Sequence, residues 1–170
     1  MLKRVTLLRH AKSSWEDSSL DDYARPLNKR GERDSPMMGR RLLARGARPS
    51  LIITSPAKRA RRTARLIAKE IGYPIEFLQR EDDLYHGDPA GILRVVGEQD
   101  NSFNDMIVVG HNPGLTELAN RLTGLKIENI PTCGIVAMEA DIRDWSELAD
   151  SRCRMVFFDY PRKRGESELD

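Results

Sequence analysis

Three short segments of this chain are apolar without alternation, and they constrain its fold more than any other feature. They are 5–9 (VTLLR), 50–55 (SLIITS) and 106–111 (MIVVGH). Branched aliphatic residues on both faces are typical of strands that are buried on two sides in a parallel sheet. Helical patterns separate the three segments, and this alternation predicts a layered α/β fold. We expect two further strands at 134–140 and 153–160, a candidate short strand at 75–79, and a connector or short helix between 140 and 152.

Proline and glycine mark where the helices are expected to begin and end. A good N-cap residue followed by proline predicts a helix start at three places, which are Ser55-Pro56, Asp88-Pro89 and Asn112-Pro113. Ser35-Pro36 is either a fourth start or a kink within a helix that begins earlier. Helix ends are expected at three glycines, Gly46, Gly72 and Gly124.

Length and composition narrow the class of protein. The chain has 170 residues, so we expect a single domain over 1–160 and a polar C-terminal tail over 161–170. A net charge of +2 gives no reason to expect nucleic acid as a partner. No apolar run reaches the roughly 20 residues of a membrane helix, and the N-terminal run is too short for a signal peptide. We therefore expect no membrane association and a cytoplasmic location.

Two histidines and two arginines follow, or lie just beyond, the three buried strands. Arg9-His10 ends the first strand, Ser55-Pro56 leads from the second into a helix that carries Arg59, and His111 ends the third. The carboxyl ends of strands in an open α/β sheet meet at the edge where ligands bind. Guanidinium groups match phosphate with paired donors, and neutral imidazole is an accepted covalent nucleophile. The pattern predicts a phosphate site that needs no metal.

A helix start at Asn112-Pro113 would add backbone donors to that site. The two cysteines, Cys133 and Cys153, form no CxxC pair. A metal site needs more ligands than this, and two free thiols are expected.

Three motifs in this order resemble a known family. LLRHAKSSW resembles the RHG motif of the histidine phosphatase superfamily, which includes the phosphoglycerate mutases. TSPAKRARRTA is similar to its second motif, Ser-x-x-x-Arg-Ala-x-x-Thr, and VVGHNPGL to its third. RPLNKRG and GHNPGL narrow the resemblance to the SixA-type phosphohistidine phosphatases. The resemblance implies a three-layer α/β/α sandwich, phosphoglycerate mutase-like, with a mostly parallel central sheet.

The resemblance also implies roles for individual residues. His10 would be the nucleophile and would form a covalent phosphohistidine, with no metal and no cofactor. Arg9, Arg59 and His111 would hold the phosphoryl group and stabilise the transition state. Ser13 is at a position that can touch phosphate, and with Asn112 it completes the expected substrate-binding set. Between two arginines His10 should stay neutral, whereas His111 should be protonated when the phosphate dianion is bound. Activity is then expected to fall on the acid side as His10 protonates.

The sequence departs from the family pattern at three positions. Ala11 replaces the glycine of RHG, Lys12 stands where the mutases have an acidic or amide residue, and Glu16 replaces a frequent asparagine. These departures disfavour a mutase. Arg61, Arg62 and Arg65 share the helix with Arg59 and are expected to be exposed.

Two roles stay open in the sequence. The proton donor to the leaving group is expected to be His86, with Asp82 and Asp83 as alternatives, or else none of the three. Arg25 either lies near the site or caps a loop with its side chain.

The expected function is that of a phosphatase acting on phosphohistidine in a protein, such as a histidine phosphotransfer domain. The alternative is a phosphatase for small phosphomonoesters, with a phosphorylated metabolite as the partner. A third hypothesis, a non-catalytic phosphate-binding interaction module, is disfavoured because all four central residues are present.

Overall fold

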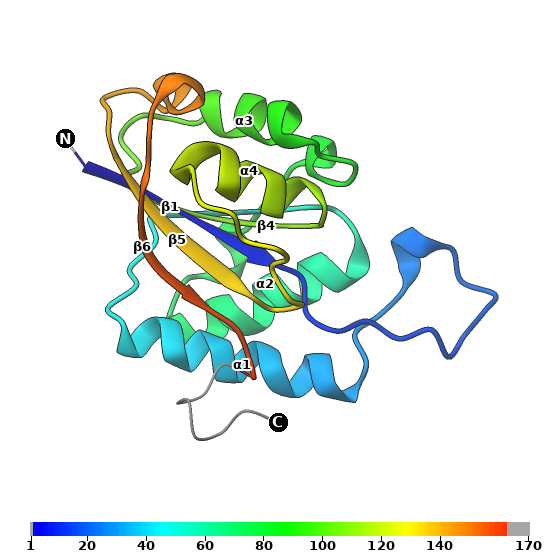
Figure 1. Cartoon of the computed structure of the whole chain (residues 1–170). Helices are drawn as coiled ribbons and strands as arrows, with labels where there is room; N and C mark the ends of the chain where they lie inside the picture. The colour runs from blue at the N-terminus through cyan, green and yellow to red at the C-terminus, as the bar shows by residue number, and fades with distance from the viewer. Residues whose placement is uncertain (1, 163–170) are drawn as a thin grey trace.

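A computed structural model describes residues 2–162 as one six-stranded sheet with helices on both faces (Figure 1). The strand order is β3-β2-β4-β1-β5-β6. The strands are β1 (Leu2–Arg9), β2 (Leu51–Thr54), β3 (Gln79–Arg80), β4 (Asp105–Gly110), β5 (Ile135–Asp141) and β6 (Arg154–Asp159). The α-helices are α1 (Lys29–Ala44), α2 (Lys58–Ile71), α3 (Pro89–Gly97) and α4 (Gly114–Thr123). Four 3-10 helices join them: η1 (Asp22–Ala24), η2 (Ile75–Phe77), η3 (Asp82–Leu84) and η4 (Trp145–Asp150).

Five of the six strands run in the same direction, and only β5 runs against them. β1 pairs with β4, β4 with β2, and β2 with β3, all in parallel. β5 runs antiparallel to β1, and β6 runs antiparallel to β5. The predicted strands and the mostly parallel sheet are confirmed. The candidate strand at 75–79 is displaced, because η2 occupies Ile75–Phe77 and the strand begins only at Gln79.

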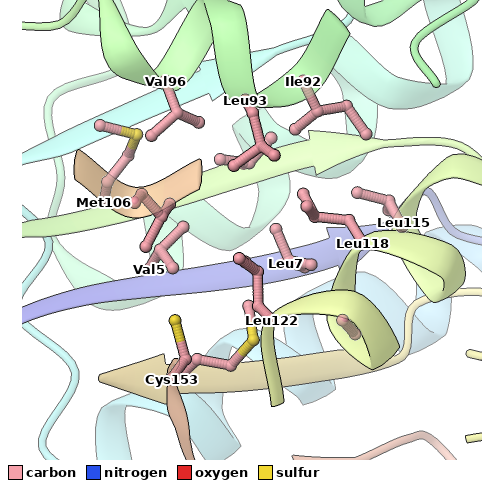
Figure 2. Close-up of a cluster of buried hydrophobic side chains, with 14 of the residues drawn as sticks. Val5, Leu7, Ile92, Leu93, Val96, Met106, Leu115, Leu118, Leu122 and Cys153 are labelled. Atoms are coloured by element: carbon pink, nitrogen blue, oxygen red, sulfur yellow. The ribbon is translucent and has the colours of Figure 1, made fainter. Parts of the chain in front are cut away.

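Successive side chains along the strands point to opposite faces of the sheet, so each face has its own core. One core packs the sheet against α3, α4 and η4, and it includes Leu7, Met106 and Leu118 (Figure 2). The other packs it against α1 and α2, and it includes Leu8 and Ile107. Figure 1 shows α1 and α2 on one side of the strands and α3 and α4 on the other. The predicted three-layer α/β/α sandwich is confirmed.

The proline rule was right at one helix start and wrong at two. α3 begins at Pro89, and the Asp88 side chain accepts from the Gly91 amide as an N-cap should. α2 begins only at Lys58 and α4 only at Gly114, because the chain makes a further turn after each strand before it enters the helix. Ser35-Pro36 lies inside α1, which begins at Lys29 after the N-cap Asn28.

The glycine rule for helix ends is confirmed. Gly72 and Gly124 are the C-caps of α2 and α4, with φ of 79° and 74°, and Gly46 has φ of 80° just beyond α1. The left-handed region is open to glycine at little cost, which is why helices end there. Within residues 2–162, no helix has the length and apolarity needed to cross a bilayer. Residues 163–170 of the predicted tail lie outside the described residues.

Candidate active site

The register of the central strands brings the two histidines to the same edge of the sheet. Arg9 of β1 pairs with Gly110 of β4, so the residue after each strand has the other as its neighbour. The His10 amide donates to the Gly110 carbonyl at 3.1 Å. The ring centroids of His10 and His111 are 5.1 Å apart. The predicted convergence of these elements is therefore present in the structure.

The His10 ring is held in one tautomer. Its Nδ1 lies 2.8 Å from the Ala11 carbonyl oxygen, which can only accept a hydrogen bond. Nδ1 therefore carries the proton, and the lone pair of a neutral ring is on Nε2. His10 is 8% exposed. Burial lowers the pKa of His10 to about 3, with help from the positive potential of His111, Arg59 and Arg9 and against the hydrogen bond to Ala11. The ring is thus a neutral base with one available nitrogen.

His111 is positioned by the strand on the other side of β4. Its Nε2 lies 2.7 Å from Ser55 Oγ, and the Ser55 amide donates to the Val109 carbonyl at 2.9 Å. Burial lowers the pKa of His111 to about 4, and Arg59 adds to this while Asp22 opposes it. The predicted protonation of His111 in the presence of a bound dianion stays a prediction, because an added anion would raise this pKa.

Arg9 and Arg59 carry donors without partners. Among the described residues, the buried side-chain nitrogen and oxygen atoms that lack a hydrogen bond are Arg9 Nε and Arg59 Nε. Arg9 Nη1 donates to the Ile130 carbonyl at 2.9 Å, so its fork is anchored at one end only. A buried cationic donor without an acceptor is costly unless a ligand satisfies it. The two unpaired Nε atoms therefore indicate an anion site beside the histidines.

Asp22 holds one side of this site, and the sequence analysis missed it. Its Oδ2 accepts from Arg59 Nη2 at 2.9 Å and from the Tyr85 hydroxyl at 2.7 Å, while Oδ1 accepts from Arg25 Nη2 at 3.2 Å. Burial alone would raise the pKa of Asp22, but the hydrogen bonds from Tyr85, Arg59 and Arg25 lower it to about 2. Asp22 therefore stays an anion that fixes the Arg59 fork.

Tyr85 connects Asp22 to the histidines. Its ring stands edge-on to His111 at 5.7 Å between centroids and lies 4.3 Å from His86. Tyr85 lies among the expected proton donors Asp82, Asp83 and His86, and no sequence motif distinguishes it. His86, Asp82 and Asp83 are all exposed. The role of proton donor stays a prediction.

Arg25 lies at the periphery of the site, which answers the question that the sequence left open. Its Nη1 donates to Ser13 Oγ at 2.8 Å, and its guanidinium stacks 3.5 Å from the centroid of the Trp15 ring. Arg25 also donates to the Asp22 carboxylate, and this carboxylate connects it to Arg59. A contact between Ser13 and substrate stays a prediction.

The Asn112 side chain has structural partners. Its Nδ2 donates to the Ile130 carbonyl and to Asn129 Oδ1, both at 2.9 Å. Its Oδ1 accepts from the Thr116 amide at 3.1 Å and from the Thr116 hydroxyl at 2.9 Å. Asn112 thus holds the loop whose Ile130 carbonyl anchors Arg9. Its predicted contact with substrate stays a prediction.

The structure explains the spacing of Arg59 and Thr63 in the second motif, TSPAKRARRTA. Thr63 Oγ1 accepts from the Ala11 amide at 2.9 Å and donates to the Arg59 carbonyl at 2.8 Å. α2 is thereby tied to the turn that follows His10. The Ala11 methyl group lies in the core under α1 and α2, which accounts for alanine in place of the family's glycine.

Within residues 2–162, no three His, Cys, Asp or Glu side chains are grouped as a metal site requires, and independence of metals stays a prediction.

Comparisons with known proteins agree with this geometry. Residues 5–101 match the family model of the histidine phosphatase superfamily (branch 1). An uncharacterized chloroplastic protein of Arabidopsis thaliana is 32% identical over 153 residues, which cover 85% of this chain and 70% of that protein.

Two solved structures share the fold over nearly their whole length. One is a protein of Nakamurella multipartitia that carries the name phosphohistidine phosphatase SixA. It has a TM-score of 0.81 and 22% identity, and the match covers 95% of this chain and 97% of that one. The other is a protein of Agrobacterium tumefaciens under the same name, with a TM-score of 0.78, 26% identity and coverage of 92% and 96%.

Proposed function

Because the chain belongs to the histidine phosphatase superfamily, we propose that it hydrolyses phosphohistidine in a protein through a covalent phosphohistidine at His10. The observation that carries this proposal is the pair of unpartnered buried donors, Arg9 Nε and Arg59 Nε, beside a neutral imidazole. A phosphoryl group placed between them would satisfy both donors and would put its phosphorus within reach of His10. The name of the Agrobacterium tumefaciens relative, phosphohistidine phosphatase SixA, supports the choice of substrate.

The chemistry takes two displacements at phosphorus. The lone pair of His10 Nε2 attacks the phosphorus, and the bond from phosphorus to the substrate's imidazole nitrogen breaks. The departing nitrogen keeps that electron pair and takes up a proton. A water oxygen then attacks the phosphorus on His10, the new bond to nitrogen breaks, and inorganic phosphate leaves with the oxygen of that water. Arg9, Arg59 and His111 would bind the oxygens of the transferring group, where charge stabilisation supplies most of the rate.

A direct test compares two kinds of substrate. The purified chain is incubated with a phosphorylated histidine phosphotransfer domain and, separately, with a panel of phosphorylated metabolites. We expect release of phosphate from the domain with a kcat/KM well above that on any metabolite. A domain that keeps its phosphate, together with rapid turnover of a phosphomonoester, would replace this proposal with the small-molecule alternative.

The low pKa of His10 predicts how the protein responds to pH. At about pH 5 an ordinary histidine is mostly protonated, whereas His10, with a pKa of about 3, should stay neutral. The acid limb of activity that follows the protonation of His10 should therefore lie below the unperturbed range of histidine. ¹⁵N spectra of the imidazoles should show a neutral His10 with its proton on Nδ1. A His10 resonance that titrates near the ordinary value would contradict this assignment.

The lowered pKa values of His10 and His111 also affect the free energy of unfolding. Below the ordinary pKa of histidine the unfolded chain takes up protons at His10 and His111 that the folded chain excludes. The free energy of unfolding should therefore fall as the pH is lowered through that range. A variant with both histidines replaced by glutamine should show a flatter dependence when its unfolding by denaturant is followed against pH.

A further inference from the structure

The side of α2 that carries Arg61, Arg62 and Arg65 has hollows next to one another. Three hollows of about 430, 490 and 390 Å³ lie along this helix. Arg65 lines all three of them, while Arg61 and Arg62 each line two. Because neighbouring hollows share these side chains, they form one surface, which we call the α2 groove. Its cations are Lys58, Arg61, Arg62, Arg65, Lys69 and Arg80.

The charge of the α2 groove is strongly positive. Two carboxylates line it, Glu32 and Glu76, against the six cations. Glu32 accepts from Arg62 Nε at 3.1 Å, in an exposed pair that neutralises one cation. Arg61 Nε donates to the Pro56 carbonyl at 2.8 Å, a contact that leaves its charge in place. The chain as a whole has a net charge of only +2, so the cations are concentrated here.

Apolar side chains accompany the cations. Ile75 is 43% exposed and lines two of the hollows, and Phe77 of the same 3-10 helix is 65% exposed. A nucleic acid would draw mainly on phosphate contacts and on stacking against aromatic faces. The aliphatic side chains that line the hollows, Ile75, Leu66 and Leu78, offer no stacking face and instead fit a protein surface that is acidic and has an apolar anchor.

The groove begins at the edge of the sheet where the histidines lie. Thr54 lines it and immediately precedes Ser55, which contacts His111. Lys58 lines it and immediately precedes Arg59. A partner seated along α2 would therefore reach the two histidines with a side chain from its own edge.

We propose that the α2 groove docks the acidic face of the phosphorylated protein and thereby presents its phosphohistidine to His10. This inference rests on the proposed function, since it names the surface by which that substrate is recognised. Complementary charge of this kind acts mainly on the rate of encounter, so it should raise kcat/KM and make it sensitive to salt. A small phosphoramidate has no surface to dock and should be indifferent to the groove.

The test reverses two charges in the groove and two elsewhere. Arg65→Glu with Arg80→Glu is compared with Arg94→Glu and Arg143→Glu, which change the net charge equally. Arg94 is on α3, on the opposite face of the sheet, and Arg143 follows β5 at the other edge; both are exposed. Two substrates are compared. One is a phosphorylated histidine phosphotransfer domain that has an acidic surface, and the other is the small molecule phosphoimidazole. For the groove variant we expect kcat/KM on the domain to fall about tenfold or more at low salt, with a weaker salt dependence. Turnover of phosphoimidazole should stay unchanged.

Each other outcome has a definite meaning. If the wild-type chain dephosphorylates the domain and the groove variant does so equally well, or if the control pair loses as much, docking at α2 is wrong while the proposed function stands. If the unphosphorylated domain binds the wild-type chain but not the groove variant, and the phosphorylated domain is not hydrolysed, docking stands and the proposed function is wrong. Polyuridylate that binds the groove more tightly than the domain and displaces it would replace the protein partner with RNA.

Discussion

Replacing His10 by alanine should abolish turnover, with kcat lower by about 10⁴-fold or more, the size of effect seen when a covalent nucleophile is removed. The structure leaves Nε2 as the unprotonated nitrogen of a neutral ring beside two arginines. No other described group at this edge combines a lone pair, a fixed tautomer and burial. Rates on a phosphorylated histidine phosphotransfer domain, measured under saturating substrate, would give the effect directly.

The same variant has a second readout. The chain is incubated with ³²P-labelled substrate and denatured in alkali, without an acid quench. The wild-type chain should then carry label on His10, and the variant should carry none. Peptide mapping of the labelled wild-type chain is the control, because it should place the label on His10 and none on the exposed His86. Full labelling of the His10→Ala chain would sink the covalent assignment.

Replacing Arg59 by methionine should lower kcat/KM about 10³-fold, as the loss of an arginine from a phosphoryl transition state does. Arg59 is 5% exposed, its Nε has no partner, and Asp22 fixes its two Nη atoms through a carbonyl at 2.6 Å and a carboxylate at 2.9 Å. The fork is thus oriented before any ligand binds. Arg59→Lys should recover little, because an ammonium is a point charge without paired donors.

Arg62→Met is the matched control for this prediction when both variants are assayed on phosphoimidazole, which has no surface to dock at the α2 groove. Arg62 is one turn further along α2 and pairs with Glu32 in an exposed contact. Methionine keeps the length and the helix propensity at both positions, so the two variants should have similar melting temperatures. A loss at position 59 no larger than at position 62 would show that Arg59 does not act on the transferring group.

Much of the fold follows from the order of residues. Uninterrupted aliphatic segments predicted buried strands at 5–9, 50–55 and 106–111, and the helical patterns between them predicted the layers. Both are properties of local periodicity, which the chain carries whatever its neighbours are. The helix ends at Gly72 and Gly124 were predictable for a similar reason, because the left-handed conformation at each end is a local property of a single glycine. The helix starts after Ser55 and Asn112 were not, because the chain turns once more before each helix begins, while these two side chains also bond to the distant residues His111 and Ile130.

Some residues of the site could also be predicted from the sequence, and others could not. Sequence order placed His10 and His111 directly after strands and Arg59 early in the helix that follows another, and parallel strands share an edge, so their convergence was predictable. Asp22 and Tyr85 carry no such mark, because neither lies at a strand end and their hydrogen bond spans 63 residues. Their role depends on how the loop after β1 and the turn after β3 meet above α2.

The sequence by itself determined which groups can do chemistry here: two imidazoles and two guanidinium groups at or just beyond the ends of buried strands. Only the tertiary structure decided their chemical state. The Ala11 carbonyl selects the tautomer of His10, burial keeps both rings neutral, and Asp22 orients Arg59. A tautomer, a pKa and the direction of a fork depend on distances of a few ångströms between segments that are far apart in the chain, and a linear pattern contains no such distances.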